Sequence, residues 1–355
     1  MSSGATEPAS REGLPDFVGD LDLASRRVGA SVMAANDELF AERENLIRPG
    51  EPTHALEAFG HKGKTYDGWE TRRRREPGQD WAIVRLGAPG VVTGVVVDTS
   101  FFRGNYPPEI SIEAIAVPGY PGAADLLGLS WTTLVPRSPA LGHTNNAYAV
   151  TDPHRWTHIR LTIYPDGGVA RLRVHGYAVP DPALLTGTID LAAAELGGRL
   201  LDCSDAFYSS PGNLLMPGRA AVMSDGWENA RRRDDGNDYA TFALAAPGVV
   251  RRMEVDTTCF VGNAPGWVRL SGAAVSGAES DESAGGAEAE WRELLARTAV
   301  QPDCRHFFAA ADAEPVDRVR LDVYPDGGLS RLRIWGELTA EALEHAQRRW
   351  LETSP

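Results

Sequence analysis

The sequence predicts an all-β protein built from two tandem, similar β-sandwich domains of the jelly-roll type, followed by a short C-terminal helix. Three features of the 355-residue sequence support this prediction: an internal repeat over nearly the whole chain, short segments in which apolar and polar residues alternate, and frequent Gly and Pro between those segments. Alternation with a period of two is typical of strands with one buried face. No long amphipathic segments separate the strands, which disfavours a fold of alternating strands and helices.

The repeat defines the domains. YPDGG occurs at 164–168 and at 324–328, DGWETRRRR (67–75) corresponds to DGWENARRR (225–233), and VDTSFFRGN (97–105) corresponds to VDTTCFVGN (255–263). A period near 160 residues is the size of a domain and is far too long for a solenoid repeat. We therefore expect a disordered tail (1–19), a first repeat (20–178), a linker with two prolines (179–188), a second repeat (189–337) and the C-terminal helix (338–355).

The elements within each repeat follow from local patterns. Residues 84–99 predict two strands around a Gly/Pro turn, and HIRLTIY (158–164) and ARLRVHG (170–176) predict two more. YPDGG is the turn between the latter pair, because Pro presets one dihedral angle and Gly accepts positive φ. The Ser/Gly/Ala/Glu-rich segment 276–290 predicts a mobile surface loop. Thr339 is suited to cap the N-terminus of the final helix.

Composition excludes several classes of partner. The formal net charge of −14 disfavours binding to nucleic acid or to an anionic membrane, which both reward clustered positive charge. No apolar run approaches the roughly 20 residues that a membrane helix needs. The three cysteines form no CxxC pair, and the first twenty residues lack the apolar stretch of a signal peptide. These features indicate reduced thiols and a cytoplasmic location.

Two short motifs carry weak signals. AFGHKGKT (58–65) looks like a phosphate loop, but no apolar strand precedes it and no apolar helix follows, so a Gly-rich loop is favoured. The arginine run 72–75 is either an anion-binding patch or a strand whose arginines pair with carboxylates. The second repeat retains three of these arginines as residues 231–233 and has Ala230 in place of Arg72. Both interpretations remain open, because a requirement of the fold would leave the same trace.

A richer polar constellation occurs once in each repeat. Two aspartates, a glutamate and an asparagine accompany Gly and Trp at predicted strand ends: Asp67, Glu70, Asp98 and Asn105 in the first repeat, and Asp225, Glu228, Asp256 and Asn263 in the second. Such groups suit a small polar ligand, and a carboxylate with a raised pKa can act as a general base. The alternative is that the polar residues cap turns while Trp69 and Trp227 pack in the core.

These residues also carry a family resemblance. The ordered and duplicated series DGWETRRRR, Asp80-Trp81, VDTSFFRGN and YPDGG resembles the allantoicases (allantoate amidinohydrolases) over about residues 20–336. The resemblance implies two jelly-roll domains of a galactose-binding-like type. It also implies hydrolysis of allantoate to ureidoglycolate and urea, a step of purine (allantoin) degradation, in a cytosolic homo-oligomer. Some members are stimulated by a divalent metal such as Mn²⁺, although this sequence shows no ligand set that we can assign.

The resemblance and the chemistry of the substrate together suggest roles for site residues. Arginine suits the carboxylate of allantoate, and Asp, Glu and Asn suit its ureido groups. The expected catalytic residues are Asp67, Glu70 and Asp98, and the expected substrate-binding residues are Trp69, Arg73, Arg75, Arg103, Asn105 and Glu113. Their expected equivalents in the second repeat are Asp225, Glu228, Arg231, Asp256 and Asn263.

We expect the principal site in the first repeat. There Arg103, Trp81 and Glu113 stand where the second repeat has Val261, Tyr239 and Ser271. A site between the repeats is the alternative. Two other functions are also open: a non-catalytic pair of ligand-binding or sugar-binding sandwiches, and a hydrolase of a related ureido acid.

Overall fold

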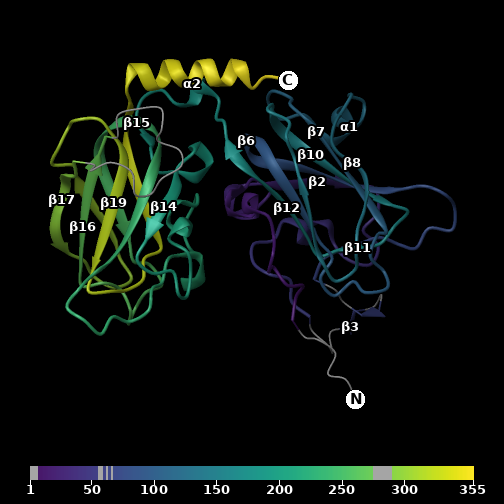
Figure 1. The fold of residues 1–355 in the computed structure, drawn as a ribbon, viewed down its shortest axis with the longest axis horizontal. Coiled ribbons are helices and arrows are strands. Elements are labelled where there is room, and N and C mark those ends of the chain that lie inside the picture. Colours follow the sequence, from purple (N-terminus) through teal and green to yellow (C-terminus); the bar gives the residue numbers. More distant parts are fainter. Residues whose placement is uncertain (1–6, 55–58, 61–62, 65–66, 275–289) are drawn as a thin grey trace. The chain divides into compact units, whose positions relative to one another are not determined.

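The computed structural model describes residues 7–54, 59–60, 63–64, 67–274 and 290–355. The chain divides into two compact units (Figure 1), the first formed by residues 1–179 with 352–355 and the second by residues 180–351. The division falls at the start of the predicted linker. The segments 58–65 and 276–290, expected as a Gly-rich loop and a mobile loop, lie wholly or partly outside the described residues.

The first unit contains one eight-stranded antiparallel sheet in the order β1-β12-β6-β10-β7-β8, with β2 and β9 also paired to β6. Two short two-stranded sheets, β11-β5 and β3-β4, accompany it. The strands are β1 (Leu21–Asp22), β2 (Ser31–Ala35), β3 (Phe59–Gly60), β4 (Gly63–Lys64), β5 (Trp69–Glu70), β6 (Asp80–Asp98), β7 (Glu109–Ile115), β8 (Thr132–Pro139), β9 (Asn145–Ala149), β10 (Arg155–Tyr164), β11 (Gly168–Val169) and β12 (Arg171–Ala178).

Strand β6 is the element that makes this sheet a sandwich. Residues 82–85 of β6 pair with β2 and β10, whereas residues 94–98 pair with β9 and β12. The strand therefore passes from one layer to the other, and both of its ends lie at the same end of the sandwich. The prediction of two strands around a turn at 84–99 is wrong, because Pro89 and Gly90 bend a single strand instead of ending it.

YPDGG connects β10 to β12, but these two strands do not form a hairpin, since each pairs with β6. Gly167 has φ +144° and its copy Gly327 has φ +131°, which explains the requirement for glycine at this position. At Gly168 a Cβ would lie 2.1 Å from the ring of Phe102. The turn is therefore packed tightly against the loop that follows β6.

Part of the predicted tail is ordered. Residues Asp16–Gly19 form a 3₁₀ helix, η1, and Ala9 is buried with its N–H donating to Ser100 Oγ at 2.7 Å. Phe17 supplies the physical reason, because its ring lies against Gly94 and 5.9 Å from the ring of His175. The sequence pattern missed this contact, since a single aromatic residue is a weak signal.

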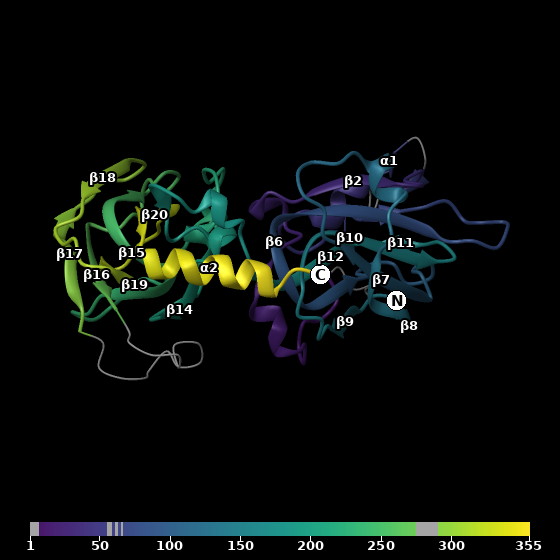
Figure 2. The same cartoon turned by 90° about the horizontal axis from the view of Figure 1, so that it is seen from above.

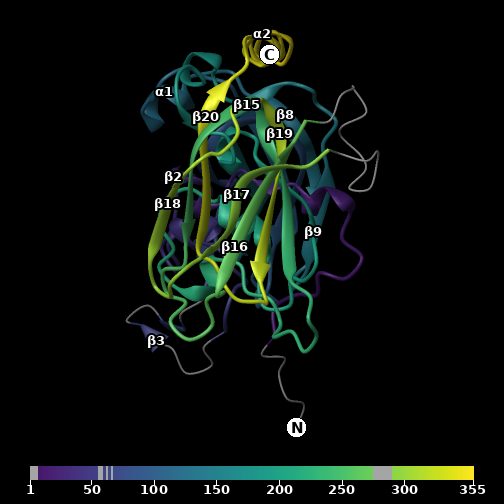
Figure 3. The same ribbon diagram turned by 90° about the vertical axis from the view of Figure 1, so that its left-hand side faces the viewer.

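The second unit repeats the architecture, with an eight-stranded sheet in the order β13-β20-β15-β19-β16-β17, and with β14 and β18 also paired to β15. Figure 3 shows these strands with the second unit toward the viewer. They are β13 (Ile189–Asp190), β14 (Arg199–Cys203), β15 (Asp238–Asp256), β16 (Trp267–Ala273), β17 (Arg292–Ala299), β18 (Arg305–Ala309), β19 (Val316–Tyr324) and β20 (Arg331–Leu338). The predicted fold class, two similar sandwiches in tandem, is confirmed.

Helices are few. The α-helices are α1 (Ala123–Leu127) and α2 (Ala340–Glu352), and further 3₁₀ helices are η2 (Arg26–Val28), η3 (Arg43–Ile47), η4 (Pro182–Leu184), η5 (Ala194–Leu196), η6 (Pro211–Leu215) and η7 (Met223–Asp225). In Figure 2, α1 lies beside β2, and its Leu126 is buried with Ile83 and Ile115. Thr339 caps α2 as predicted, its Oγ1 accepting the Ala342 N–H at 3.1 Å. Within the described residues, no helix has the length and apolar character needed to cross a bilayer.

Candidate active site at the loop end of the first repeat

Three loops meet where β6 begins and ends. The short strand β5 lies between two partners: Trp69 and Glu70 pair with β11, and the backbone of Glu70 also bridges Ala41. Asn105, in the loop after β6, accepts the Gly168 N–H through its backbone carbonyl at 2.7 Å. The DGWE segment, the RGN segment and YPDGG are thus held together at one end of the sandwich.

Glu70 and Asn105 form the centre of this region. Asn105 Nδ2 donates to Glu70 Oε1 at 2.7 Å, and among the described residues nothing donates to Oε2. Burial raises the pKa of Glu70, and the hydrogen bond from Asn105 offsets part of this rise. The same pair exists in the second repeat, where Asn263 Nδ2 donates to Glu228 Oε1 at 2.6 Å. Glu70 is therefore a positioned carboxylate with one oxygen available to a ligand.

Asp67 is engaged in the scaffold. Its Oδ2 accepts Arg171 Nη2 at 2.8 Å and the Thr53 N–H at 2.9 Å, and its Oδ1 accepts Arg48 Nη1 at 3.2 Å. Burial alone would raise the pKa of Asp67, but the hydrogen bonds from Arg171 and the Thr53 N–H, together with the charges of Arg171 and Arg48, lower it. The Arg171 side chain is only 2% exposed, so Asp67 neutralises a buried guanidinium. This arrangement gives Asp67 a structural function.

Asp98 caps the end of β6. Its Oδ1 accepts the Ser100 N–H at 2.7 Å, and the residue is 3% exposed. Burial raises the pKa of Asp98, against the opposing hydrogen bond from Ser100. Asp256 does the same in the second repeat, where its Oδ1 accepts the Thr258 N–H at 2.8 Å. Because both copies use this aspartate to form the same turn, the structure favours capping for Asp98.

Two other predicted residues have side chains with partners other than Glu70. Trp69 is fully buried, and its Nε1 donates to the Asp37 carbonyl at 2.7 Å, so its ring belongs to the core and cannot be reached by a substrate. Glu113 accepts Arg160 Nε at 2.7 Å across β7 and β10. It alternates along β7 with the buried Ile112, which places it on the face of the sheet opposite the core.

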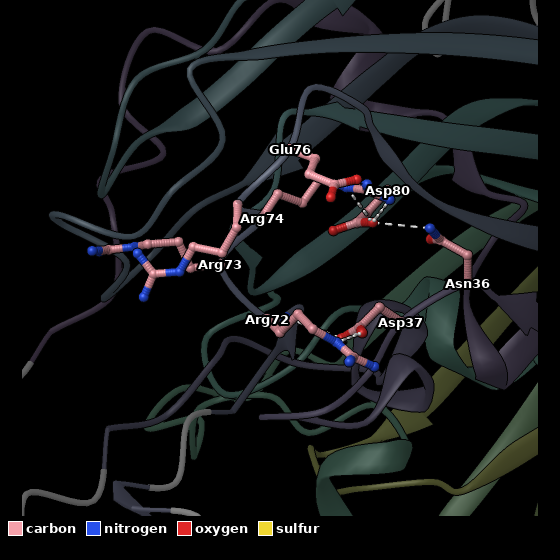
Figure 4. A pocket seen from close by; sticks show the side chains of 8 residues that line it. Asn36, Asp37, Arg72, Arg73, Arg74, Glu76 and Asp80 are labelled. Atoms are coloured by element: carbon pink, nitrogen blue, oxygen red, sulfur yellow. Dashed lines mark hydrogen bonds and ion pairs between the residues drawn. The ribbon is translucent and has the colours of Figure 1, made fainter.

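The arginine run is a loop that borders an open cleft of about 490 Å³ together with Asn36, Asp37, Glu76 and Asp80. Arg74 anchors this loop: its backbone N–H donates to Asp166 of YPDGG at 2.8 Å and its Nε donates to Asp80 at 3.0 Å. Figure 4 shows Arg73 extending away from Asp80. Arg73 and Arg75 are exposed and have no partner among the described residues. Only these two flanking arginines are thus available to a ligand.

The second repeat explains why the middle arginine of this run is retained. The backbone N–H of Arg232 donates to Asp326 at 2.8 Å and its Nη1 donates to Asp238 at 2.6 Å, the contacts that Arg74 makes in the first repeat. Arg231 and Arg233 are exposed, like Arg73 and Arg75. Asp225 accepts the Ala221 N–H at 2.9 Å. The middle arginine therefore serves the fold in both copies.

Sequence reasoning missed His143. The Phe101 N–H donates to His143 Nδ1 at 3.0 Å, and Arg103 Nη2 lies 3.2 Å from His143 Nε2. Burial and the charge of Arg103 lower the pKa of His143. A signal existed in the repeat, because LGHTNNAYAV (141–150) corresponds to QPDCRHFFAA (301–310) and places Asp303 opposite His143. Arg103 was predicted, and it lies in the same loop as Asn105.

A divalent metal does not fit the described residues. Nowhere among them do three or more His, Cys, Asp or Glu side chains converge as a ligand set. The hydrogen-bonding partner of Glu70 is an amide, and those of Asp67 are guanidinium and backbone or hydroxyl groups. We therefore derive no step through a metal.

Comparison with known proteins places the chain in a family. The allantoicase repeat matches residues 21–179 and again residues 189–339. The chain belongs to the allantoicase family. A probable allantoicase of Nocardia farcinica is 55% identical over 89% of this chain and 94% of its own length, and one of Streptomyces coelicolor is 49% identical over 90% and 86%. The crystal structure of the Saccharomyces cerevisiae allantoicase superposes with a TM-score of 0.75, at 34% identity over 89% of this chain and 92% of that one.

Membership of the allantoicase family confirms the predicted resemblance, and the two matched segments correspond to the two structural units. Of the predicted site residues, the structure brings Glu70, Asn105 and Arg103 into one loop system. Arg73 and Arg75, which follow Glu70 closely in the sequence, border the cleft. Asp67 and Asp98 instead make structural contacts, with Arg171 and with the Ser100 N–H.

Proposed function

We propose that this chain is an allantoicase that hydrolyses allantoate to ureidoglycolate and urea, with the reaction at the Glu70–Asn105 pair of the first repeat. The observation that carries the activity is the match of both repeats to the allantoicase family, together with relatives that are about half identical over most of their length. The observation that supports the site is a half-buried carboxylate with a raised pKa, one oxygen of which has no donor within the described part of the chain.

Glu70 is the proposed general base. Hydrolysis places the hydroxyl group of water on the central carbon of allantoate and a proton on the nitrogen of the departing urea. Glu70 Oε2 can take the proton from water and deliver it to that nitrogen, so that the carboxylate is regenerated. The raised pKa favours this cycle, because it brings the basicity of the carboxylate closer to neutral pH.

Asn105 and the free arginines are proposed to bind the substrate. Asn105 Nδ2 orients Glu70, and its Oδ1 has no donor among the described residues, so it can accept a ureido N–H. Arg73 and Arg75 border the cleft and have no partner among the described residues, so their N–H groups can donate to the carbonyl oxygen of a ureido group. Asp67 and Asp98 support these residues from the scaffold.

The test is an assay of urea release by the purified protein with allantoate, run as prepared, with EDTA and with added Mn²⁺ so that metal dependence is measured directly. We expect urea release. Glu70→Gln should lower kcat by roughly 10²–10⁴ fold, the typical contribution of a general base. The matched variant Glu228→Gln changes the equivalent residue of the second repeat and should retain activity.

The outcomes separate the alternatives. Equal losses in Glu70→Gln and Glu228→Gln would contradict a site in the first repeat alone. No urea under any metal condition would contradict the activity and favour a non-catalytic pair of ligand-binding sandwiches. Release of urea only from another ureido acid would indicate a related hydrolase.

A homo-oligomer in the cytoplasm is also proposed. Phe207 and Val261 of the second unit are 71% and 70% exposed, and apolar surface of this kind is suited to contact with another copy. The three cysteines are free thiols, as expected in a reducing compartment. Light scattering coupled to size-exclusion chromatography tests the assembly, and a mass of 38.2 kDa would contradict it.

A further inference from the structure

We propose that His143 and Arg103 together form the binding site for the substrate carboxylate, in which His143 acts as a neutral N–H donor. This inference rests on the proposed function, since it assigns a residue to the recognition of that substrate. It extends the site by a histidine that no sequence motif identified.

The protonation of His143 follows from its neighbour. The Phe101 N–H points at Nδ1 at 3.0 Å, and a backbone N–H can only donate, so Nδ1 must be the unprotonated nitrogen. A neutral imidazole then carries its proton on Nε2. Burial and the positive charge of Arg103 favour this neutral form, whereas the negative charge of Asp98 opposes it. His54 completes the surroundings, with its ring stacked on Phe101 at 5.0 Å.

The proton on Nε2 places two donors against each other. Arg103 Nη2 lies 3.2 Å from His143 Nε2, and guanidinium nitrogens have no lone pair to offer. Neither group satisfies the other, so both N–H groups can donate to one acceptor that lies between them. An anionic oxygen is the acceptor that a guanidinium prefers, and allantoate supplies one as its carboxylate.

The backbone holds this donor pair in a strained conformation. Phe101 has φ +69° and His143 has φ +54°, values that non-glycine residues rarely adopt. The conformation exists in both repeats, since Cys259 has φ +73° and Asp303 has φ +51°. The strain therefore belongs to the scaffold, and only the side chains differ between the copies.

The side chains at these two positions differ between the repeats as we would expect if Arg103 and His143 bind the same ligand. In the second repeat Asp303 Oδ1 accepts the Cys259 N–H at 2.8 Å, so the backbone cap is retained. The donor function is lost, because an aspartate has no N–H and Val261 stands in place of Arg103. An aspartate would also repel a carboxylate. Both donors are absent together from the second repeat, as expected if they serve one ligand.

The chain itself suggests the test variant. His143→Asp introduces the residue of the second repeat, which retains the cap on Phe101 but replaces the donor with a negative charge. His143→Asn retains the cap and a shorter N–H donor. Asp303→Asn is the matched control in the second repeat. The readouts are KM for allantoate, the melting temperature, and binding of N-carbamoylglycine, a ureido acid, compared with its neutral amide.

We expect His143→Asp to raise KM and to weaken binding of N-carbamoylglycine at least tenfold, with binding of the amide unchanged. His143→Asn should give intermediate values, and Asp303→Asn should match the wild type. These results would not follow from a purely structural role, because that role would affect the acid and the amide equally.

Wild-type KM and wild-type discrimination between acid and amide in both His143 variants would overturn the inference while the hydrolysis itself stands. If His143→Asp also lowers the melting temperature, the result rests on His143→Asn. A wild-type KM and a wild-type preference for the acid in His143→Asn would overturn the inference. If wild-type protein releases no urea, the proposed function fails, and the preference for the acid still tests the anion site. A wild-type protein that neither hydrolyses allantoate nor distinguishes the acid from the amide would overturn both.

Discussion

Replacing Asp67 with Asn separates a structural role from a catalytic one. Asp67 stands in the same DGWE segment as Glu70, but its carboxylate accepts Arg171, Thr53 and Arg48. Asn keeps the shape and one acceptor oxygen, yet it removes the negative charge. The Arg171 side chain, 2% exposed, would then carry a buried positive charge without a counter-charge from residue 67.

The size of the stability loss depends on the hydrogen bonds that Arg171 keeps in the Asp67→Asn variant. Removing one partner of a fully buried ion pair costs about 3–5 kcal/mol. Arg171 Nη1 also donates to the carbonyls of Ala170 at 2.7 Å and Asp67 at 3.1 Å, and the Asp67 side chain is 13% exposed. We therefore expect a loss of about 2–3 kcal/mol in the free energy of unfolding of the first unit. For a unit of this size, that corresponds to roughly 4–12 °C in melting temperature.

The pH dependence gives a second measurement. Because the folded-state pKa of Asp67 is lowered, its stabilising contribution is present above the pKa of the unfolded chain and is lost as the pH falls through the folded value. The difference between wild type and Asp67→Asn should therefore shrink in acid.

Calorimetry of the full chain at several pH values measures both effects, with Glu70→Gln as the control that should lose activity and keep its melting temperature. An Asp67→Asn protein with wild-type melting and no turnover would refute this reasoning and make Asp67 a catalytic residue.

Three further changes have defined outcomes. Asn105→Ala removes the hydrogen bond that lowers the pKa of Glu70, so the acid limb of the kcat/KM profile should move to higher pH; an unmoved limb would mean that another group controls it. Burial first, and then Arg85, lower the pKa of His158 to about 4, so stability present above pH 6.5 should fall by about 3 kcal/mol toward pH 4. His158→Gln should flatten that part of the denaturation profile, and an equally steep profile would exclude His158 as its source. Arg73→Ala should raise KM for allantoate several-fold with little change in kcat; an unchanged KM would remove Arg73 from substrate binding.

The fold could be predicted from the sequence because two independent patterns, the internal repeat and the alternation of apolar and polar residues, indicate the same architecture. The repeat fixed the number of domains, and the alternation in HIRLTIY and ARLRVHG identified β10 and β12. The path of β6 could not be predicted in the same way. Pro89 and Gly90 are ordinary turn residues, and only the pairing of β6 with strands of both layers shows that they bend one strand.

The site was less predictable, because its residues are distinguished by distant partners. Asp67 and Glu70 are equally polar and three positions apart, yet Asp67 meets Arg171, 104 residues away, while Glu70 meets Asn105. Glu113 likewise pairs with Arg160 on the outer face of the sheet. Sequence patterns indicate which face of a strand a residue occupies, but they do not indicate which charge lies opposite it.

Comparing the two repeats supplies part of that missing information. A contact made between equivalent residues in both copies, such as Arg74 with Asp80 and Arg232 with Asp238, is explained by the shared fold. The Glu70–Asn105 pair is also present in both copies, so its presence alone cannot locate the chemistry.

What differs between the copies is the surroundings of that pair. The first repeat has two N–H donors, Arg103 in the loop that also carries Asn105, and His143 in contact with that loop, whereas the second has Val261 and Asp303 in the same backbone conformation. A carboxylate substrate would be attracted to the first arrangement and repelled by the second. We therefore propose that the base is common to both repeats, and that the ability to hold an anionic substrate next to it confines hydrolysis to the first.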